Sequence, residues 1–67
     1  MMNGLKIHAS IAERRDGYRV TVSMTQDQQT RELVTRTVPS RREAETIAKA
    51  FASLHGVPWY KVKVSSS

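Results

Sequence analysis

One segment of the chain has helical periodicity, and residues that favour helix ends flank it on both sides. Ser40 can cap the helix N-terminus, and Glu43 three residues later completes a Ser-x-x-Glu capping box after Pro39. Gly56 stands where a C-cap needs positive φ, and Pro58 follows as a stop. The pattern predicts one helix from residue 41 to about His55. Its apolar stripe should pack on a sheet and consists of Ala44, Ile47, Ala48, Phe51 and Leu54.

The rest of the chain alternates apolar and polar residues with a period of two, which is typical of strands with one buried face. Residues 5–12, 18–24, 31–38 and 59–64 follow this pattern. Asp16-Gly17 predicts a hairpin with a primed turn between the first two strands, and the polar residues 25–30 predict a loop before the third.

The predicted fold class is therefore α+β in the order β-β-β-α-β. A three-stranded antiparallel meander is extended by a fourth strand, with one helix packed on one sheet face. The right-handed crossover rule sets the last strand parallel to the third, either beside it or beside the first.

The alternation also predicts which side chains point away from the helix. In the third strand we expect Val34 and Val38 to face inward, with Arg36 on the same side near the sheet edge. In the last strand Tyr60, Val62 and Val64 should face the helix, and the opposite side should carry Trp59, Lys61 and Lys63.

A chain of 67 residues is expected to form one domain, here residues 1–64, followed by a disordered polar tail at 65–67. There is no cysteine, so a disulfide framework is excluded, and a reducing, cytoplasmic location is expected. No apolar run is long enough to span a bilayer, and the start of the chain lacks a signal-peptide pattern. We therefore expect no membrane association.

Catalysis is not predicted. His8 and His55 lie on different predicted elements, and the acidic residues fall mostly in turns or on the exposed helix face. No cysteine or histidine spacing suggests a metal site, and three scattered glycines cannot form a phosphate-binding loop. We expect neither enzyme activity nor a cofactor, and a pocket with convergent titratable groups would argue against that expectation.

Basic residues favour a polyanionic partner, since eleven Lys and Arg against six Asp and Glu give a formal charge of +5. The predicted uncovered sheet face is basic and hydroxylated and carries one aromatic, which suits contacts with phosphates and bases. The candidate nucleic-acid-binding residues are Lys6, Arg14, Arg15, Arg19, Thr21, Trp59, Lys61 and Lys63. Arg41 and Arg42 are secondary candidates, because basic residues are unfavourable at a helix N-terminus unless a partner uses them.

Structural interpretations of the same residues stay open. Trp59 can instead fold over the sheet edge or the helix end as part of the core, and lysines on edge strands also protect against aggregation. Arg14 and Arg15 can equally form a solvated turn.

Two segments resemble the arm-type DNA-binding domain of phage and transposon integrases. They are Asp16-Gly17-Tyr18-Arg19-Val20-Thr21-Val22 and Thr37-Val38-Pro39-Ser40-Arg41-Arg42-Glu43-Ala44-Glu45, and the resemblance covers about residues 13–55. It implies a three-stranded sheet, backed by a helix, that enters the major groove with Arg19, Thr21 and Ser23 facing DNA. The strand order also resembles small uncharacterised bacterial domains, a likeness that implies no function.

The leading hypothesis is a non-enzymatic DNA-binding module. The alternative is a small protein-interaction or inhibitor module of the kind that phages encode, such as an anti-CRISPR. It would dock its basic surface on an acidic protein or add an edge strand to a partner sheet. A homodimer is a separate expectation, because the sheet leaves two edges and one face uncovered.

Overall fold

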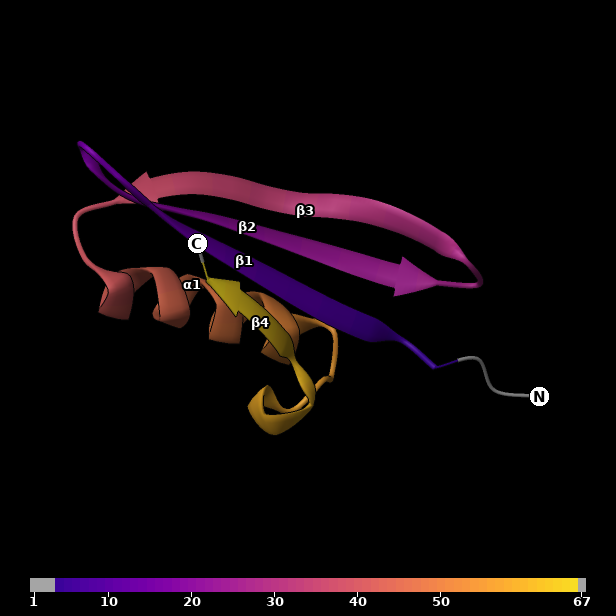
Figure 1. Cartoon of the computed structure of the whole chain (residues 1–67). Helices are drawn as coiled ribbons and strands as arrows, with labels where there is room; N and C mark the ends of the chain where they lie inside the picture. The colour runs from indigo at the N-terminus through magenta and orange to yellow at the C-terminus, as the bar shows by residue number, and fades with distance from the viewer. Residues whose placement is uncertain (1–3, 67) are drawn as a thin grey trace.

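In the computed structural model, which describes residues 4–66, four strands form one sheet and one helix crosses one of its faces (Figure 1). The elements follow in the order β1 (Lys6–Arg14), β2 (Gly17–Gln26), β3 (Gln29–Val38), α1 (Arg41–Leu54), the 3-10 helix η1 (Trp59–Lys61) and β4 (Lys63–Ser66). The predicted α+β class and the β-β-β-α-β order are confirmed. In the described part of the chain, no helical segment has the length and apolar character needed to span a membrane.

The sheet order is β3-β2-β1-β4, and β4 pairs with β1 in parallel. β1, β2 and β3 form the antiparallel meander. Of the two positions that the crossover rule allowed for the last strand, the chain takes the one beside the first strand. The outer edges of the sheet therefore belong to β3 and β4.

The core lies between α1 and the two central strands. Ile7, Ala9 and Ile11 of β1 and Val20 and Val22 of β2 are at most 1% exposed. They meet a row of small helical residues at i, i+4 spacing, Ala44, Ala48 and Ala52, which are equally buried. Small side chains let the helix approach the sheet closely.

Because the alanine row faces the sheet, the buried face of the helix is rotated about the helix axis relative to the predicted apolar stripe. Ile47 and Phe51 pack at the side of the core, as expected of stripe residues, but Leu54 is 76% exposed. The prediction for Leu54 was wrong, because the helix faces the sheet through its alanines and Leu54 lies off that line.

Both hairpin turns contain two residues. Arg15 and Asp16 connect β1 to β2, and Gly17 follows with φ +138°. A Cβ on Gly17 would clash with the backbone carbonyl oxygen of Val38, so this position requires glycine. The turn therefore lies one residue before the predicted Asp16-Gly17. The predicted primed geometry is wrong, since Asp16 does not have positive φ.

The second connection differs more from its prediction. Instead of a loop over residues 25–30, β2 continues to Gln26, β3 begins at Gln29, and Thr25 pairs with Thr30. Asp27 and Gln28 form the turn with φ 55° and 66°, which is the combination that a primed hairpin turn needs.

A bulge in β3 determines which side chains after Glu32 point toward the helix. Val34 pairs with Val22 but Glu32 pairs with Ser23, so Leu33 is the extra residue. Val34 and Val38 pack against the core as predicted, and Leu33 joins them because the bulge lets consecutive residues face the same side. Arg36 pairs with the buried Val20 and so lies on the helix side at the sheet edge, also as predicted.

The C-terminal segment corrects the predicted strand over residues 59–64. Residues 59–61 form η1, and the strand starts only at Lys63. Val62 packs against the core as expected, but Tyr60 is 83% exposed. Ser65 and Ser66, predicted as tail, belong to β4, and Ser67 lies outside the described residues.

Candidate functional site

The side chains of the sheet that point away from α1 form a surface that we call the open face. Its composition follows from the register, because paired residues share a face. Across the strands, its cross-strand rows are Lys6-Thr25-Thr30, Lys63-His8-Ser23-Glu32, Ser65-Ser10-Thr21-Thr35 and Ala12-Arg19-Thr37. None of these side chains is buried, and no described element covers them (Figure 1).

Hydroxyl groups occupy the middle of the open face. One row consists entirely of Ser and Thr, in the order Ser65, Ser10, Thr21 and Thr35. The Thr35 hydroxyl donates to the Thr21 hydroxyl at 3.4 Å. Ser and Thr side chains both donate and accept, so this band can bond to phosphate oxygens and to base edges.

Positive charge lies at the two ends of the open face. Arg19 lies at one end, close to the hairpin that carries Arg14 and Arg15. Lys6 and Lys63 lie at the other end. Lys6 and Arg14 are eight residues apart on β1, or about 26 Å at the rise of an extended strand. Glu32 is the one acidic side chain in the cross-strand rows of the described strands.

The lysine end of the open face is hollowed. A cavity of about 590 Å³ is lined by Lys6, Lys61, Lys63 and His8 together with Ile7, Ser23, Thr25 and Thr30, and we call it the basic hollow. Two hydrogen bonds order its rim: His8 Nε2 to the Ser65 hydroxyl at 2.8 Å, and Thr25 Oγ1 to Thr30 Oγ1 at 2.9 Å. No acidic side chain lines the cavity.

The basic hollow brings titratable groups together, so its chemistry bears on the expectation that the protein is not an enzyme. Its groups are three lysines and one histidine, and the lining contains no carboxylate to orient the imidazole. The Ser65 hydroxyl contacts His8 on an exposed sheet edge. Within residues 4–66, no three His, Cys, Asp or Glu side chains gather as metal ligands would. Three lysine side chains around one cavity can bind an anion.

Trp59 is not on the open face, and that prediction was wrong. It is half-buried against the core on the helix side, where Lys49 Nζ of α1 lies 5.5 Å from its ring centroid. The cause is η1, which interrupts the period of two between Trp59 and Lys63. Lys63 lies in a row of the open face and Lys61 lines the basic hollow beside it, but the described rows of the open face contain no aromatic residue.

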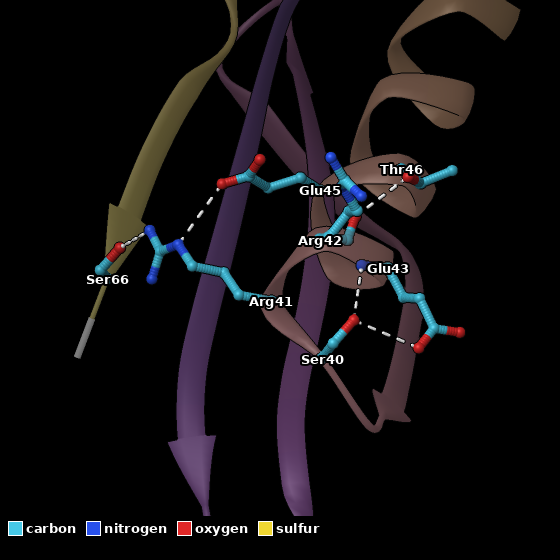
Figure 2. Close-up of polar contacts among 7 residues, drawn as sticks. All are labelled: Ser40, Arg41, Arg42, Glu43, Glu45, Thr46 and Ser66. Atoms are coloured by element: carbon cyan, nitrogen blue, oxygen red, sulfur yellow. Dashed lines mark hydrogen bonds and ion pairs between the residues drawn. The ribbon is translucent and has the colours of Figure 1, made fainter.

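Arg41 and Arg42 lie in the helix layer, apart from the other candidates. Figure 2 shows Arg41 reaching from the first turn of α1 to the end of β4, where it donates to the Ser66 hydroxyl at 2.6 Å. It also forms an ion pair with Glu45 at 3.4 Å. Arg41 therefore ties the helix to the last strand, which accounts for a basic residue at this helix end. The exposed Arg42 accepts a bond from Thr46 only through its backbone carbonyl.

Sequence reasoning missed Thr25, Thr30 and Ser65 as site residues. Thr25 and Thr30 were placed in a loop and Ser65 in a tail, although all three lie in strands at the lysine end. The sequence contained a signal for the threonines. Thr25 and Thr30 lie at equal distances from Asp27 and Gln28, so they can pair across a two-residue turn at those positions. Ser65 carried no such signal.

Comparisons with protein-family models, with curated proteins and with solved structures found no significant match to this chain.

Proposed function

We propose that the protein is a non-enzymatic module that binds duplex DNA through the open face. The observation that carries the proposal is an uncovered sheet face with cations at both ends and a hydroxyl band between them. Lys and Arg supply the phosphate contacts that dominate affinity, and Ser and Thr hydroxyls bond to phosphates or base edges.

The spacing of the charges agrees with a groove-spanning role. The two basic ends lie about 26 Å apart along β1, whereas the DNA major groove is about 12 Å wide. A sheet laid across the groove would reach the backbone on both sides with Arg14, Arg19 and Lys6, and would place the row of Thr21 over the base edges. Other proteins read DNA with β-ribbons or sheets whose strands lie in the major or minor groove.

The absence of an aromatic from the described rows of the open face favours a duplex over a single strand. Proteins that bind single strands stack bases on aromatic side chains, and here Trp59 packs against the core instead. The RNA duplex is disfavoured too, because side chains cannot read its deep, narrow major groove. The resemblance to integrase arm-type domains supports the same choice, because it implies DNA contacts by Arg19, Thr21 and Ser23.

The test is fluorescence anisotropy of a labelled short DNA duplex at low salt, with two variants that each lose two positive charges. Lys6→Gln with Arg19→Gln removes charge from the open face, and Arg36→Gln with Lys49→Gln removes it from the helix side. We expect the first pair to weaken binding about tenfold or more, since charge-assisted contacts are lost, and the second pair to leave it within about twofold. Equal losses in both variants, or no binding at low salt, would refute the proposal.

The free edge of β3 favours protein binding as a second candidate function. β3 lies at the outside of the sheet with no proline among its ten residues, and the bulge at Leu33 leaves residues 34–38 as its longest regular stretch for an added strand. A partner retained after nuclease treatment should, once purified, slow hydrogen exchange along β3. Light scattering would detect a homodimer by its mass, and slowed hydrogen exchange along β3 would show that the dimer uses this edge. Unchanged exchange in β3 would exclude this mode.

A further inference from the structure

The basic hollow has features that contact with a DNA backbone does not require. Its volume of about 590 Å³ falls within the range of about 300–1,000 Å³ that is typical of small-molecule sites. A backbone phosphate can be neutralised on a flat surface, whereas this cavity has walls from both ends of the chain. Its lysines come from β1, η1 and β4, which the parallel pairing of His8 with Lys63 holds together.

The charge of the lining matches a doubly charged group. Lys6, Lys61 and Lys63 each carry an ammonium with three rotatable donors, and no acidic side chain lines the cavity. Asp27 lies beside it, in a smaller hollow that shares Lys6 and Thr25. A terminal phosphate carries about 1.5–2 negative charges at pH 7 and presents three strong acceptor oxygens. A phosphodiester carries one charge, so three lysines favour the monoester.

The hydroxyl groups of the lining supply the remaining donors. Thr25 and Thr30 share one hydrogen bond at 2.9 Å, so one hydroxyl donates to the other and the second hydrogen remains for a ligand. Ser23 adds another hydroxyl on the same wall. His8 uses Nε2 for Ser65, which fixes the ring at the edge of the cavity and leaves Nδ1 for another partner.

We propose that the basic hollow is a binding site for a phosphomonoester, either the terminal phosphate of a nucleic-acid strand or that of a free nucleotide. The lysines neutralise the phosphate, and the Thr25-Thr30 pair bonds to its oxygens. This inference goes beyond DNA binding by the open face and does not depend on it, because a free nucleotide occupies the hollow without any strand.

The test is an NMR titration of the full, isotope-labelled chain with adenosine 5′-monophosphate, at fixed ionic strength. Adenosine 3′,5′-cyclic monophosphate is the matched diester, and adenosine is the control without phosphate. We expect the monoester to shift the amides of Lys6, Thr25 and Lys63 saturably, with an affinity about tenfold or more above that of the cyclic diester. Equal affinity for the monoester and the diester would overturn the inference.

Matched variants test whether the hollow is responsible. Lys61→Gln with Lys63→Gln should weaken binding of the monoester about tenfold or more, and Arg36→Gln with Lys49→Gln, which removes the same charge from the helix side, should leave it unchanged. Comparable weakening by both, with folding verified by the amide spectrum, would also overturn the inference.

Duplexes with and without a 5′-phosphate separate the two sources of the monoester and the two proposals. Tighter binding of the phosphorylated duplex supports a strand end as the source, and nucleotide binding with no such preference supports a free nucleotide. If the nucleotide does not bind and the 5′-phosphate does not tighten duplex binding, but the duplex still binds the open face, this inference alone is refuted. Failure of both duplexes to bind refutes the DNA proposal alone if the nucleotide still binds.

Discussion

At the scale of single residues, backbone strain is concentrated in the turn between β2 and β3. Asp27 and Gln28 have φ 55° and 66°, and they are the only described non-glycine residues with positive φ. The left-handed region costs an ordinary residue about 1–2 kcal/mol, and Asp tolerates it better than Gln. We predict that Gln28→Gly raises the free energy of unfolding by about 1 kcal/mol, measured by urea denaturation.

The neighbouring glutamine provides the control for this prediction. Gln29 is the first residue of β3 and pairs with Gln26, so Gln29→Gly should lower stability by about 0.5–1 kcal/mol through the entropy of glycine in a strand. If both substitutions destabilise the protein equally, the turn does not carry the strain described here.

Residue identity also explains which turn could be predicted. Asp16-Gly17 gave a clear signal because glycine meets a need for positive φ, and Gly17 does so. The turn at Asp27 and Gln28 has the primed geometry but contains no glycine, so a polar loop was the natural prediction. The predicted loop hid the pairing of Thr25 with Thr30, and with it one wall of the basic hollow.

At the scale of elements, the contact between α1 and the sheet depends on a row of alanines. Ala48 is 0% exposed in the middle of that row, between Ala44 and Ala52. A larger side chain there would push the helix away from the buried strand residues of the core. We predict that Ala48→Leu lowers the free energy of unfolding by about 1–3 kcal/mol, measured by thermal and urea denaturation.

Ala50 is the matched control, because it lies on the same helix with its side chain exposed. Ala50→Leu should change stability by less than about 0.5 kcal/mol, since both residues favour helices and neither packs there. A stability loss at position 50 that matches the loss at position 48 would mean that helix propensity, and not packing, explains both.

The elements differ in how far the sequence determined them. Alternation placed β1, β2 and the buried Val20 and Val22 correctly, and the cap residues placed α1, because both signals are local. The 3-10 turn at Trp59 has no comparable signal: its residues alternate as in a strand, and packing of the indole against the core decides the outcome. Lys61 and Lys63 therefore lie at the basic hollow, whereas Trp59 packs on the helix side.

At the scale of the whole molecule, charge is distributed along an elongated sheet. The Cα extents are 44 × 19 × 16 Å, and the strands run lengthwise with a turn at each end (Figure 1). The hairpin with Arg14 and Arg15 lies at one end and the basic hollow at the other. A long polyanion can contact both ends at once, whereas a small ligand can occupy only the hollow. The two proposals therefore differ in their dependence on salt.

Six cations of the open face, the hairpin and the hollow are available for phosphates: Lys6, Arg14, Arg15, Arg19, Lys61 and Lys63. If all six make contact, the logarithm of the binding constant for duplex DNA should fall against the logarithm of salt concentration with a slope of about −5. Affinity would then drop about 10³-fold between roughly 50 and 200 mM salt.

Arg14→Gln with Arg15→Gln should reduce the slope by about 2 and leave nucleotide binding in the hollow unchanged, because neither residue lines that cavity. Anisotropy titrations over a salt series measure the slope. A slope near zero, or one that the hairpin variant does not change, would show that duplex DNA does not contact the two ends together.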